Sequence, residues 1–306
     1  MTAAAAAKRK LGLLRETFQE WKDDDALQWG AALAYYSIFS IAPLLLVTIS
    51  VAGLLFGRDA VEGRLVAEIS GVVGAQAAAA IQTMVANASR TGSGVWGTIV
   101  GVGLMLLGAS GAFAHLQKSL NHLWNVEPKP DAGWRRMVRQ RLAALGMVLV
   151  VALLLLIALV LSAAVGAVAS WAEDRLPMPG WALSLVDLAV SLAVVTLLFA
   201  AIYKVLPDVE IEWRDVWLGA AATAFLFALG KLAIGFYLGH SSVASSYGAA
   251  GSLVVLLVWI FYSTQLVFFG AELTQVWARR RGRRIQPAEW ARRVQEVAVP
   301  PEGDAA

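Results

Sequence analysis

The chain has 306 residues and a formal net charge of +3, and 58% of its residues are hydrophobic while only 15% are charged. A soluble domain carries roughly 25% charged residues, so the composition excludes an ordinary soluble protein. Cysteine is absent, which excludes disulfide bonds, thiolate nucleophiles and cysteine metal ligands.

Six apolar stretches follow one another along the chain, and each has the ~20 residues that a transmembrane helix needs. They predict an all-α fold, namely a polytopic membrane protein with six transmembrane helices in one membrane domain over residues 26–277. The predicted spans cover about residues 28–56, 94–114, 142–170, 181–203, 215–238 and 250–275.

The N-terminal segment, residues 1–25, is basic and contains no apolar signal-peptide core, so we expect it to be retained. The connections between six spans alternate between the two sides of the membrane. Twenty Lys and Arg residues lie on the side of both termini, and four lie on the opposite side. The positive-inside rule therefore predicts that both termini are cytoplasmic.

The first span contains Pro43, which removes a backbone donor and predicts a kinked helix. Tyr35, Tyr36 and Ser40 place polar groups on the turns before it. Carbonyl groups freed by a proline must find other partners in lipid, which favours a protein-lined or hydrated interior beside the kink. The three side chains are therefore candidate substrate-binding residues, and a purely structural kink is the alternative.

The connection between the first and second spans, about residues 58–90, carries apolar residues at helical spacing. They are Leu65, Ile69, Val72, Val73, Ile81, Met84 and Val85. This pattern predicts one or two amphipathic helices lying on the outer surface. Such a loop is either a plain connector or a lid.

Two charged residues lie inside predicted spans, Asp187 in the fourth and Lys231 in the fifth. At about 1.5 Å per residue, they lie about 9 Å and about 12 Å below the outer ends of their helices. A charge at bilayer depth costs ~2.5–3.5 kcal/mol and normally faces the bundle interior with a partner. Asp187 and Lys231 are therefore candidates for a buried ion pair.

The connection between the fifth and sixth spans, Gly239–Ser252, is rich in serine and glycine and lies directly above Lys231. Its hydroxyl and amide groups suit a polar or anionic solute, and an ordinary hairpin loop is the alternative. The candidate substrate-binding residues in this loop are Ser241, Ser242, Ser245, Ser246 and Tyr247.

At the inner end of the sixth span, Glu272 is too far from Asp187 and Lys231 to pair with either. We expect Glu272 to pair with Lys204, with Arg214 or with the arginine cluster that begins at Arg279. Residues 278–306 are predicted to form a basic, partly disordered cytoplasmic tail. Its arginine cluster, residues 279–284, is expected to contact anionic lipids.

No enzymatic motif is recognisable. The histidines are His115, His122 and His240, and no nearby carboxylate completes a metal site with the first two. The chain contains no HExxH, no GxSxG, no P-loop and no GxGxxG after a predicted strand. We therefore expect no catalytic residue, metal or cofactor, and no binding of nucleic acid.

Four blocks resemble a known family. The run ALAYYSIFSIAPLLL (Ala32–Leu46) resembles the first-helix signature of the YihY/BrkB family of bacterial membrane proteins. Three later blocks match in the same order: HLQKSLNHLWNV (His115–Val126), YKVLPDVEIEWRDVWLGA (Tyr203–Ala220) and SSYGAAGSLVVLLVWIFYSTQLVFFGAEL (Ser245–Leu273). The resemblance implies a six-helix inner-membrane protein, in a family whose members have been labelled ribonuclease BN or virulence factors. The segment around Lys231 departs from the family, which often carries tryptophan there.

These observations predict a multi-pass protein of the bacterial inner membrane that transports or exports a polar, amphiphilic or lipid-linked solute through a polar pocket near the outer face. The alternatives are a non-transporting scaffold in envelope assembly and an enzyme acting on lipid head groups. A ribonuclease is disfavoured, because the cytoplasmic connections are too short for a nuclease fold. Expected partners are the lipid bilayer and an unidentified small-molecule or lipid substrate. Small-residue spacing at Gly97–Gly101 and Gly235–Gly239 favours packing within the chain, with a homo-oligomer as the alternative.

Overall fold

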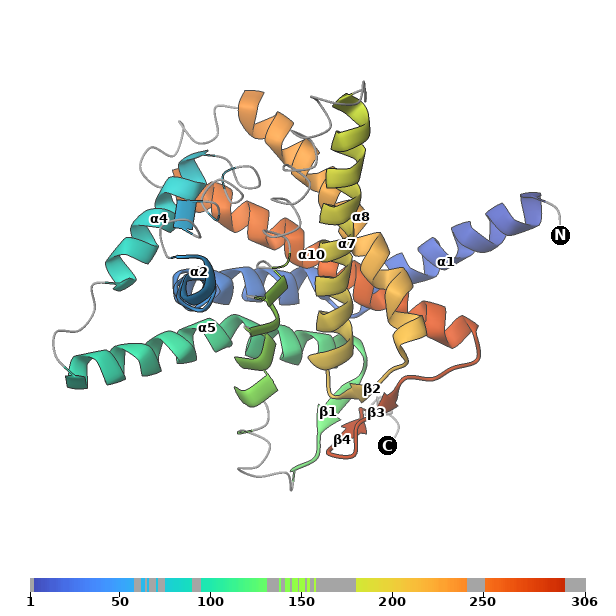
Figure 1. The fold of residues 1–306 in the computed structure, drawn as a ribbon. Coiled ribbons are helices and arrows are strands. Elements are labelled where there is room, and N and C mark those ends of the chain that lie inside the picture. Colours follow the sequence, from blue (N-terminus) through green and yellow to red (C-terminus); the bar gives the residue numbers. More distant parts are fainter. Residues whose placement is uncertain are drawn as a thin grey trace, which may run out of the picture.

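The computed structural model describes residues 3–57, 75–89, 95–130, 180–240 and 251–294, with scattered positions at 62–70 and 138–157. Helices dominate these residues (Figure 1). The helices are α1 (Ala3–Asp23), α2 (Ala26–Phe56), α4 (Ala75–Ser89), α5 (Val95–Leu123), α7 (Gly180–Val205), α8 (Trp213–His240) and α10 (Gly251–Arg280). The strands are β1 (Val126–Pro128), β2 (Val209–Glu210), β3 (Gln286–Pro287) and β4 (Ala291–Arg293).

Four of the described helices are long and apolar enough to cross a membrane. They contain Ala26–Ser50, Leu188–Val205, Trp213–Ala233 and Leu253–Arg280, and each overlaps a predicted span. The predicted second span lies within α5, a 29-residue helix. Most of the predicted third span lies outside the described residues. The structure thus confirms a largely helical membrane protein and supports four of the six predicted spans.

The helices are arranged in two pairs joined by one common helix. Helix α2 packs along α5, α7 packs along α8, and α10 contacts both pairs. Figure 1 shows the pairs running in different directions from a shared end. The largest buried cluster lies near this end, which the sequence predicts to be cytoplasmic. It includes Leu120, Leu123 and Trp124 of the α5 end, Tyr203 and Leu206 of the α7 end, Val216 and Ala220 of α8, and Phe268 and Ala271 of α10.

The N-terminal segment forms α1, which is not among the predicted helices. A two-residue turn joins it to α2, and Asp25 in this turn has a left-handed backbone with φ of 49°. The Asp25 carbonyl accepts the N–H of Gln28 at 2.9 Å, which starts α2. Ala26, the first residue of α2, is fully buried. The junction of α1 and α2 is therefore packed against the rest of the protein.

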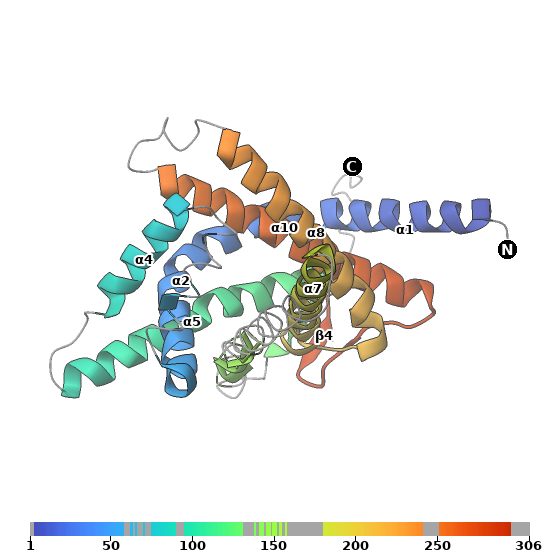
Figure 2. The same ribbon diagram turned by 45° about the horizontal axis from the view of Figure 1, so that its top comes forward.

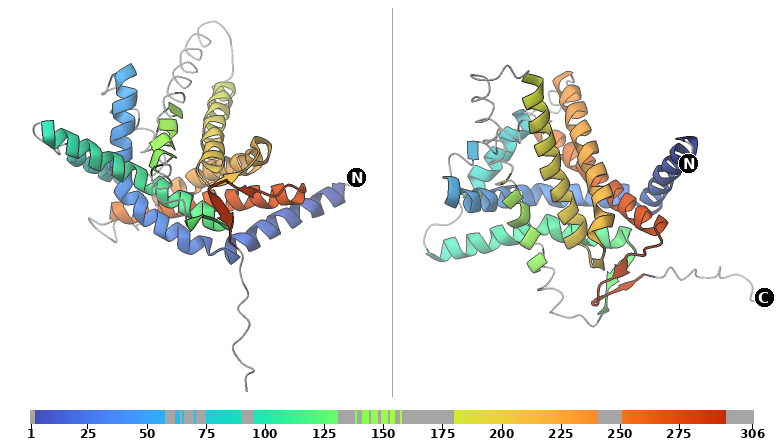
Figure 3. Two further views of the ribbon diagram at one scale, coloured as in Figure 1. Left: turned by 90° about the horizontal axis from the view of Figure 1, so that it is seen from below. Right: turned by 45° about the vertical axis from the view of Figure 1, so that its right-hand side comes forward.

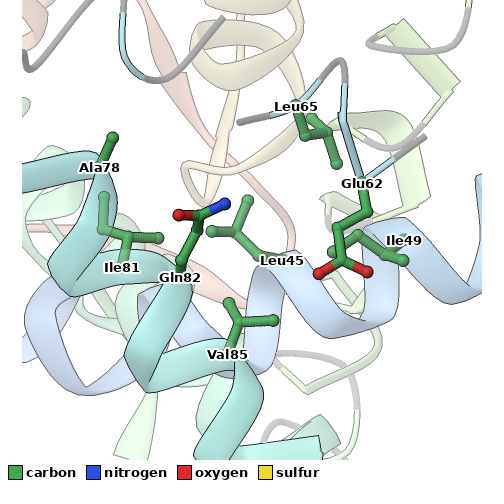
Figure 4. Close-up of a pocket in the computed structure, with 8 residues that line it drawn as sticks. All are labelled: Leu45, Ile49, Glu62, Leu65, Ala78, Ile81, Gln82 and Val85. Carbon is green, nitrogen blue, oxygen red and sulfur yellow. The ribbon is translucent and has the colours of Figure 1, made fainter. Parts of the chain in front are cut away.

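The connection between α2 and α5 contains a helix that its spacing predicts, α4. Its apolar side is buried, with Ala78, Ile81 and Val85 each at most 8% exposed. Figure 4 shows this side facing Leu45 and Ile49 of α2 across a small hollow with Glu62 and Leu65 at its rim. The apolar stripe of α4 thus packs on α2, and its predicted place on the outer surface stays a prediction.

Four short strands add a feature that the all-α prediction does not contain. β1 pairs antiparallel with β4, with Val126 opposite Arg293. β2 pairs antiparallel with β3, with Val209 opposite Pro287. Figure 3 shows these strands at the shared end of the helices. The part of the tail over residues 286–293 is therefore folded against the connections after α5 and α7, while residues 295–306 lie outside the described residues.

Candidate functional site

Only part of the predicted outer pocket falls within the described residues. Asp187 lies on α7 and Lys231 on α8, where the lysine is half-buried. The side chain of Asp187 and the whole predicted serine cluster, residues 241–247, lie outside the described residues. The ion pair and the outer pocket therefore stay predictions.

The first-span residues form a tight contact between α2 and α5. Figure 2 shows α2 changing direction along its length, and Pro43 lies inside this helix. The Ser40 hydroxyl accepts the N–H of Ala112 at 3.1 Å. A Cβ on Gly108 would lie 2.9 Å from Pro43 Cγ, and one on Gly111 would lie 3.2 Å from Ser40 Oγ. Two glycines on α5 therefore let the Ser40–Pro43 turn approach its backbone.

The two tyrosines of this segment differ in their surroundings. Tyr36 packs against His115 on α5, with ring centroids 4.5 Å apart and ring planes tilted by 32°. Tyr35 is 59% exposed and contacts its neighbours Tyr36 and Phe39 on the outer side of α2. Tyr36 thus belongs to the contact between α2 and α5, whereas Tyr35 does not point into the described part of the bundle.

At the shared end of the helices, α1 is bound to α10 by ion pairs. Arg279 contacts Glu16 at 2.6 Å and Glu20 at 2.7 Å, and Arg280 contacts Glu16 at 2.7 Å. Burial alone would raise the pKa of Glu16, but hydrogen bonds from Arg279 and Arg280 outweigh it and hold the pKa below its ordinary value. Two of the arginines in the cluster that was expected to contact lipid, Arg279 and Arg280, thus pair with acids of the same chain.

None of the three basic groups expected beside Glu272 forms an ion pair with it, although the charge of Arg279 acts on its carboxylate. The Lys204 ammonium donates to the Ile211 carbonyl, Arg214 lies 3.6 Å from Glu212, and Arg279 pairs with α1. The expected charge pairing of Glu272 with Lys204 is therefore not what the structure shows. The reason is local, because Lys204 ends α7 and turns toward the chain that follows it.

Glu272 lies instead among other acids. It is fully buried in α10, and its carboxylate lies with those of Glu20 and Asp24 in a group whose oxygens are within 4.8 Å of one another. Neither Glu272 oxygen receives a hydrogen bond from an N–H or O–H donor of the described residues. A proton held between Glu272 and Asp24 would supply one and would remove the like-charge repulsion.

This carboxylate cluster, Glu20, Asp24 and Glu272, is the candidate functional site. Sequence reasoning missed it because it assumed that a buried acid would find a base. The available signal was that Glu20 and Asp24 lie one helical turn apart, so both can face the same neighbouring helix. Chemically, such a group can take up and release a proton, and carboxylate oxygens are also the ligands that hard cations prefer.

A second polar group lies beside the strands, centred on Asp208. Its carboxylate accepts hydrogen bonds from the Trp290 indole at 2.9 Å, from Asn121 at 2.8 Å and from Gln117 at 3.3 Å. The Asn121 side-chain oxygen in turn accepts the Asp208 N–H at 2.8 Å. These contacts join α5, the connection after α7 and the tail at the shared end of the helices.

The sequence blocks and the helical arrangement agree with a family match. The model of the family described as Virulence factor BrkB matches residues 17–295. The chain belongs to this family. It is an integral membrane protein, as are the relatives named below as membrane proteins.

The relatives of this BrkB-family chain include UPF0761 membrane proteins. One from Tolumonas auensis is 30% identical over 248 residues, which cover 79% of this chain and 77% of that protein. One from Verminephrobacter eiseniae is 28% identical, over 85% of this chain and 60% of that protein. A Bacillus subtilis protein named as ribonuclease-like, YfkH, is 23% identical over 89% of this chain and 97% of its own length. No solved structure matches the chain.

Proposed function

We propose that this BrkB-family protein transports or exports a polar, amphiphilic or lipid-linked solute across the bacterial inner membrane, and that Glu272 exchanges a proton during transport. The observation that carries the proposal is the buried Glu272 carboxylate, which lies in a candidate span beside two other acids. An ionisable residue at such a position usually marks an ion or substrate pathway.

The energetics favour a role beyond packing. Replacing buried ionic groups by apolar side chains is often neutral or stabilising. The Glu272 carboxylate forms no ion pair of its own, and the charge of Arg279, which pairs with Glu16 and Glu20, offsets its burial only in part. A residue that weakens the fold in this way is explained if protonation and deprotonation belong to the working cycle.

The competing function is a non-transporting scaffold. One observation favours it, since the hollow beneath α4 has a volume of about 20 Å³ and is lined mainly by apolar side chains. A site of that size holds one water molecule at most. A scaffold would need Glu272 only for packing, so a neutral side chain of the same shape should serve equally well.

The test is the metabolite and lipid profile of a deletion strain that is complemented with variants. Glu272→Gln keeps the shape of the side chain and removes its titration, and Glu210→Gln is the control because Glu210 is exposed. We expect the Glu272→Gln strain to resemble the deletion strain, although the variant inserts and melts like the wild type. The Glu210→Gln strain should resemble the wild type.

Two results would contradict the proposal. A Glu272→Gln strain with a wild-type profile would favour the scaffold. A deletion strain with the same metabolite and lipid profile as the wild type would contradict the transport of such a solute. Once a solute accumulates or disappears in the profile, uptake or release in proteoliposomes containing the wild type and both variants shows whether the protein itself moves it.

A further inference from the structure

Helix α1 carries a row of exposed apolar side chains. Leu11, Leu14 and Phe18 are 67%, 49% and 56% exposed. Their spacing of three and seven residues places them on one face of the helix. The described part of the chain leaves this face uncovered, although the opposite side of α1 packs against α10.

The charges of α1 are sorted by face. Arg15 and Lys22 are exposed and lie beside the apolar row, and neither forms an ion pair with a residue that the structure describes. Glu16 and Glu20 lie on the opposite side, where Arg279 and Arg280 neutralise them. The outward face of α1 is therefore apolar and cationic, without an acid among its described residues.

The position of α1 fits the surface of the membrane. The helix ends two residues before α2, whose first 25 residues form a candidate span. Figures 1 and 2 show α1 projecting away from the other helices at their shared end. The same end carries Trp213 and Trp217, which are 49% and 42% exposed at the start of α8. Exposed tryptophans at a span end are typical of the membrane–water interface.

We propose that α1 lies along the anionic surface of the inner leaflet. Leu11, Leu14 and Phe18 enter the boundary between head groups and acyl chains, and Arg15 and Lys22 bind lipid phosphates. This is the arrangement of interfacial amphipathic helices. A protein partner would need acidic side chains opposite both Arg15 and Lys22. An anionic leaflet presents phosphate groups along the whole length of the helix. The inference is independent of transport.

Three arginines of the tail differ from the bases of α1, because they pair with acids. Arg279, Arg280 and Arg283 all contact acidic side chains of the chain itself. The charges of these three arginines are therefore largely neutralised by ion pairs within the protein. In α1, by contrast, Arg15 and Lys22 are exposed beside the row formed by Leu11, Leu14 and Phe18.

The experiment uses the full chain, which contains no cysteine, so one cysteine accepts a spin label at a chosen position. Labels at Leu14→Cys and Phe18→Cys report the apolar row, and Gln19→Cys is the matched control one residue away. The protein is placed in phosphatidylcholine vesicles with or without phosphatidylglycerol. Label accessibility to oxygen, which enriches in lipid, is compared with accessibility to a water-soluble nickel chelate.

We expect the labels at positions 14 and 18 to favour oxygen, and more strongly when phosphatidylglycerol is present. The label at position 19 should favour the nickel chelate. Replacing both Arg15 and Lys22 by glutamine should abolish the effect of phosphatidylglycerol at position 18, whereas Arg284→Gln should leave it unchanged.

Three results would overturn the proposal. Equal nickel accessibility at positions 18 and 19 would place α1 in water. Spin–spin broadening that disappears on dilution with unlabelled protein would show that a second copy covers the face. If the oxygen accessibility of positions 14 and 18 does not depend on phosphatidylglycerol, α1 does not bind anionic lipid.

Discussion

Gly219 and Gly270 stand where α8 crosses α10. A Cβ on Gly270 would collide with Thr223 Oγ1 and the Tyr203 hydroxyl, and a Cβ on Gly219 would collide with the Gly270 carbonyl oxygen. The Tyr203 hydroxyl lies 2.8 Å from Thr223 Oγ1 and donates to the Val267 carbonyl at 2.8 Å. The absence of side chains thus lets a buried hydrogen-bond group form between three helices.

Gly270→Ala is expected to destabilise the protein by about 1–3 kcal/mol, because overpacking a filled core forces neighbours to move. Gly146→Ala is the matched control, since no heavy atom lies within 4 Å of its Cβ position. That change should be neutral or stabilising by up to ~1 kcal/mol, as alanine favours helices over glycine. Thermal unfolding in detergent measures both variants. Equal melting temperatures would show that the crossing tolerates a methyl group.

Glu16 gives the ion pairs between α1 and α10 a pH dependence. Because its folded pKa lies below the ordinary value of 4.5, its contribution to stability is present above pH 4.5. It is lost as the pH falls through the folded pKa. We expect the difference in melting temperature between the wild type and Glu16→Gln to be constant near neutral pH and to shrink below pH 4.5. A difference that grows on acidification would contradict the assigned hydrogen bonds.

At the scale of elements, the tail strands and the Asp208 group depend on each other. Asp208→Ala removes the acceptor of three side-chain donors, and a hydrogen bond to a charged group is worth ~1.5–3 kcal/mol. We expect this variant to melt at a lower temperature than Glu210→Ala, in which an exposed neighbour is changed. Trypsin should also cut it faster after Arg284. Equal cleavage of the two variants would show that the strands hold without Asp208.

The sequence predicts the long helices and misses the short elements, for physical reasons. Apolar runs such as Ala32–Leu46 predict a span because lipid requires every backbone group to be paired within the helix. β1 and β4 contain three residues each, too few for a period, and their pairing joins Val126 to Arg293. Such pairing depends on how the helices bring distant segments together, which local pattern does not determine.

The candidate site shows the same limit. The sequence places Glu272 near the end of the sixth predicted span, and the structure shows that its side chain is buried there. The acids beside Glu272 were not predicted, because opposite charge predicts a base and the packing of α1 on α10 also brings Glu20 and Asp24 close to it. That packing depends on α1, whose alanine-rich start and mixed charges resemble an ordinary cytoplasmic segment. The outer pocket around Asp187 and Lys231 stays a prediction.

At the scale of the whole molecule, the distribution of basic residues sets the orientation that we propose. Single cysteines test it, since the chain has none of its own. Asn87→Cys at the end of α4 and Glu289→Cys in the tail are both exposed positions. An impermeant maleimide should label Asn87→Cys in intact cells and Glu289→Cys only after the membrane is opened. Labelling of Glu289→Cys in intact cells would reverse the topology.

The two strand pairs also impose an order on biogenesis. β3 and β4 follow every described helix in the chain, whereas their partners β1 and β2 are synthesised much earlier. While the ribosome is still producing α10, Val126–Pro128 and Val209–Glu210 have no strand to pair with, and Asp208 lacks its Trp290 donor. The two strand pairs can therefore form only after the last described helix has left the ribosome. A chain released before Ile285 would contain all the described helices. It would lack β3 and β4, and therefore both strand pairs.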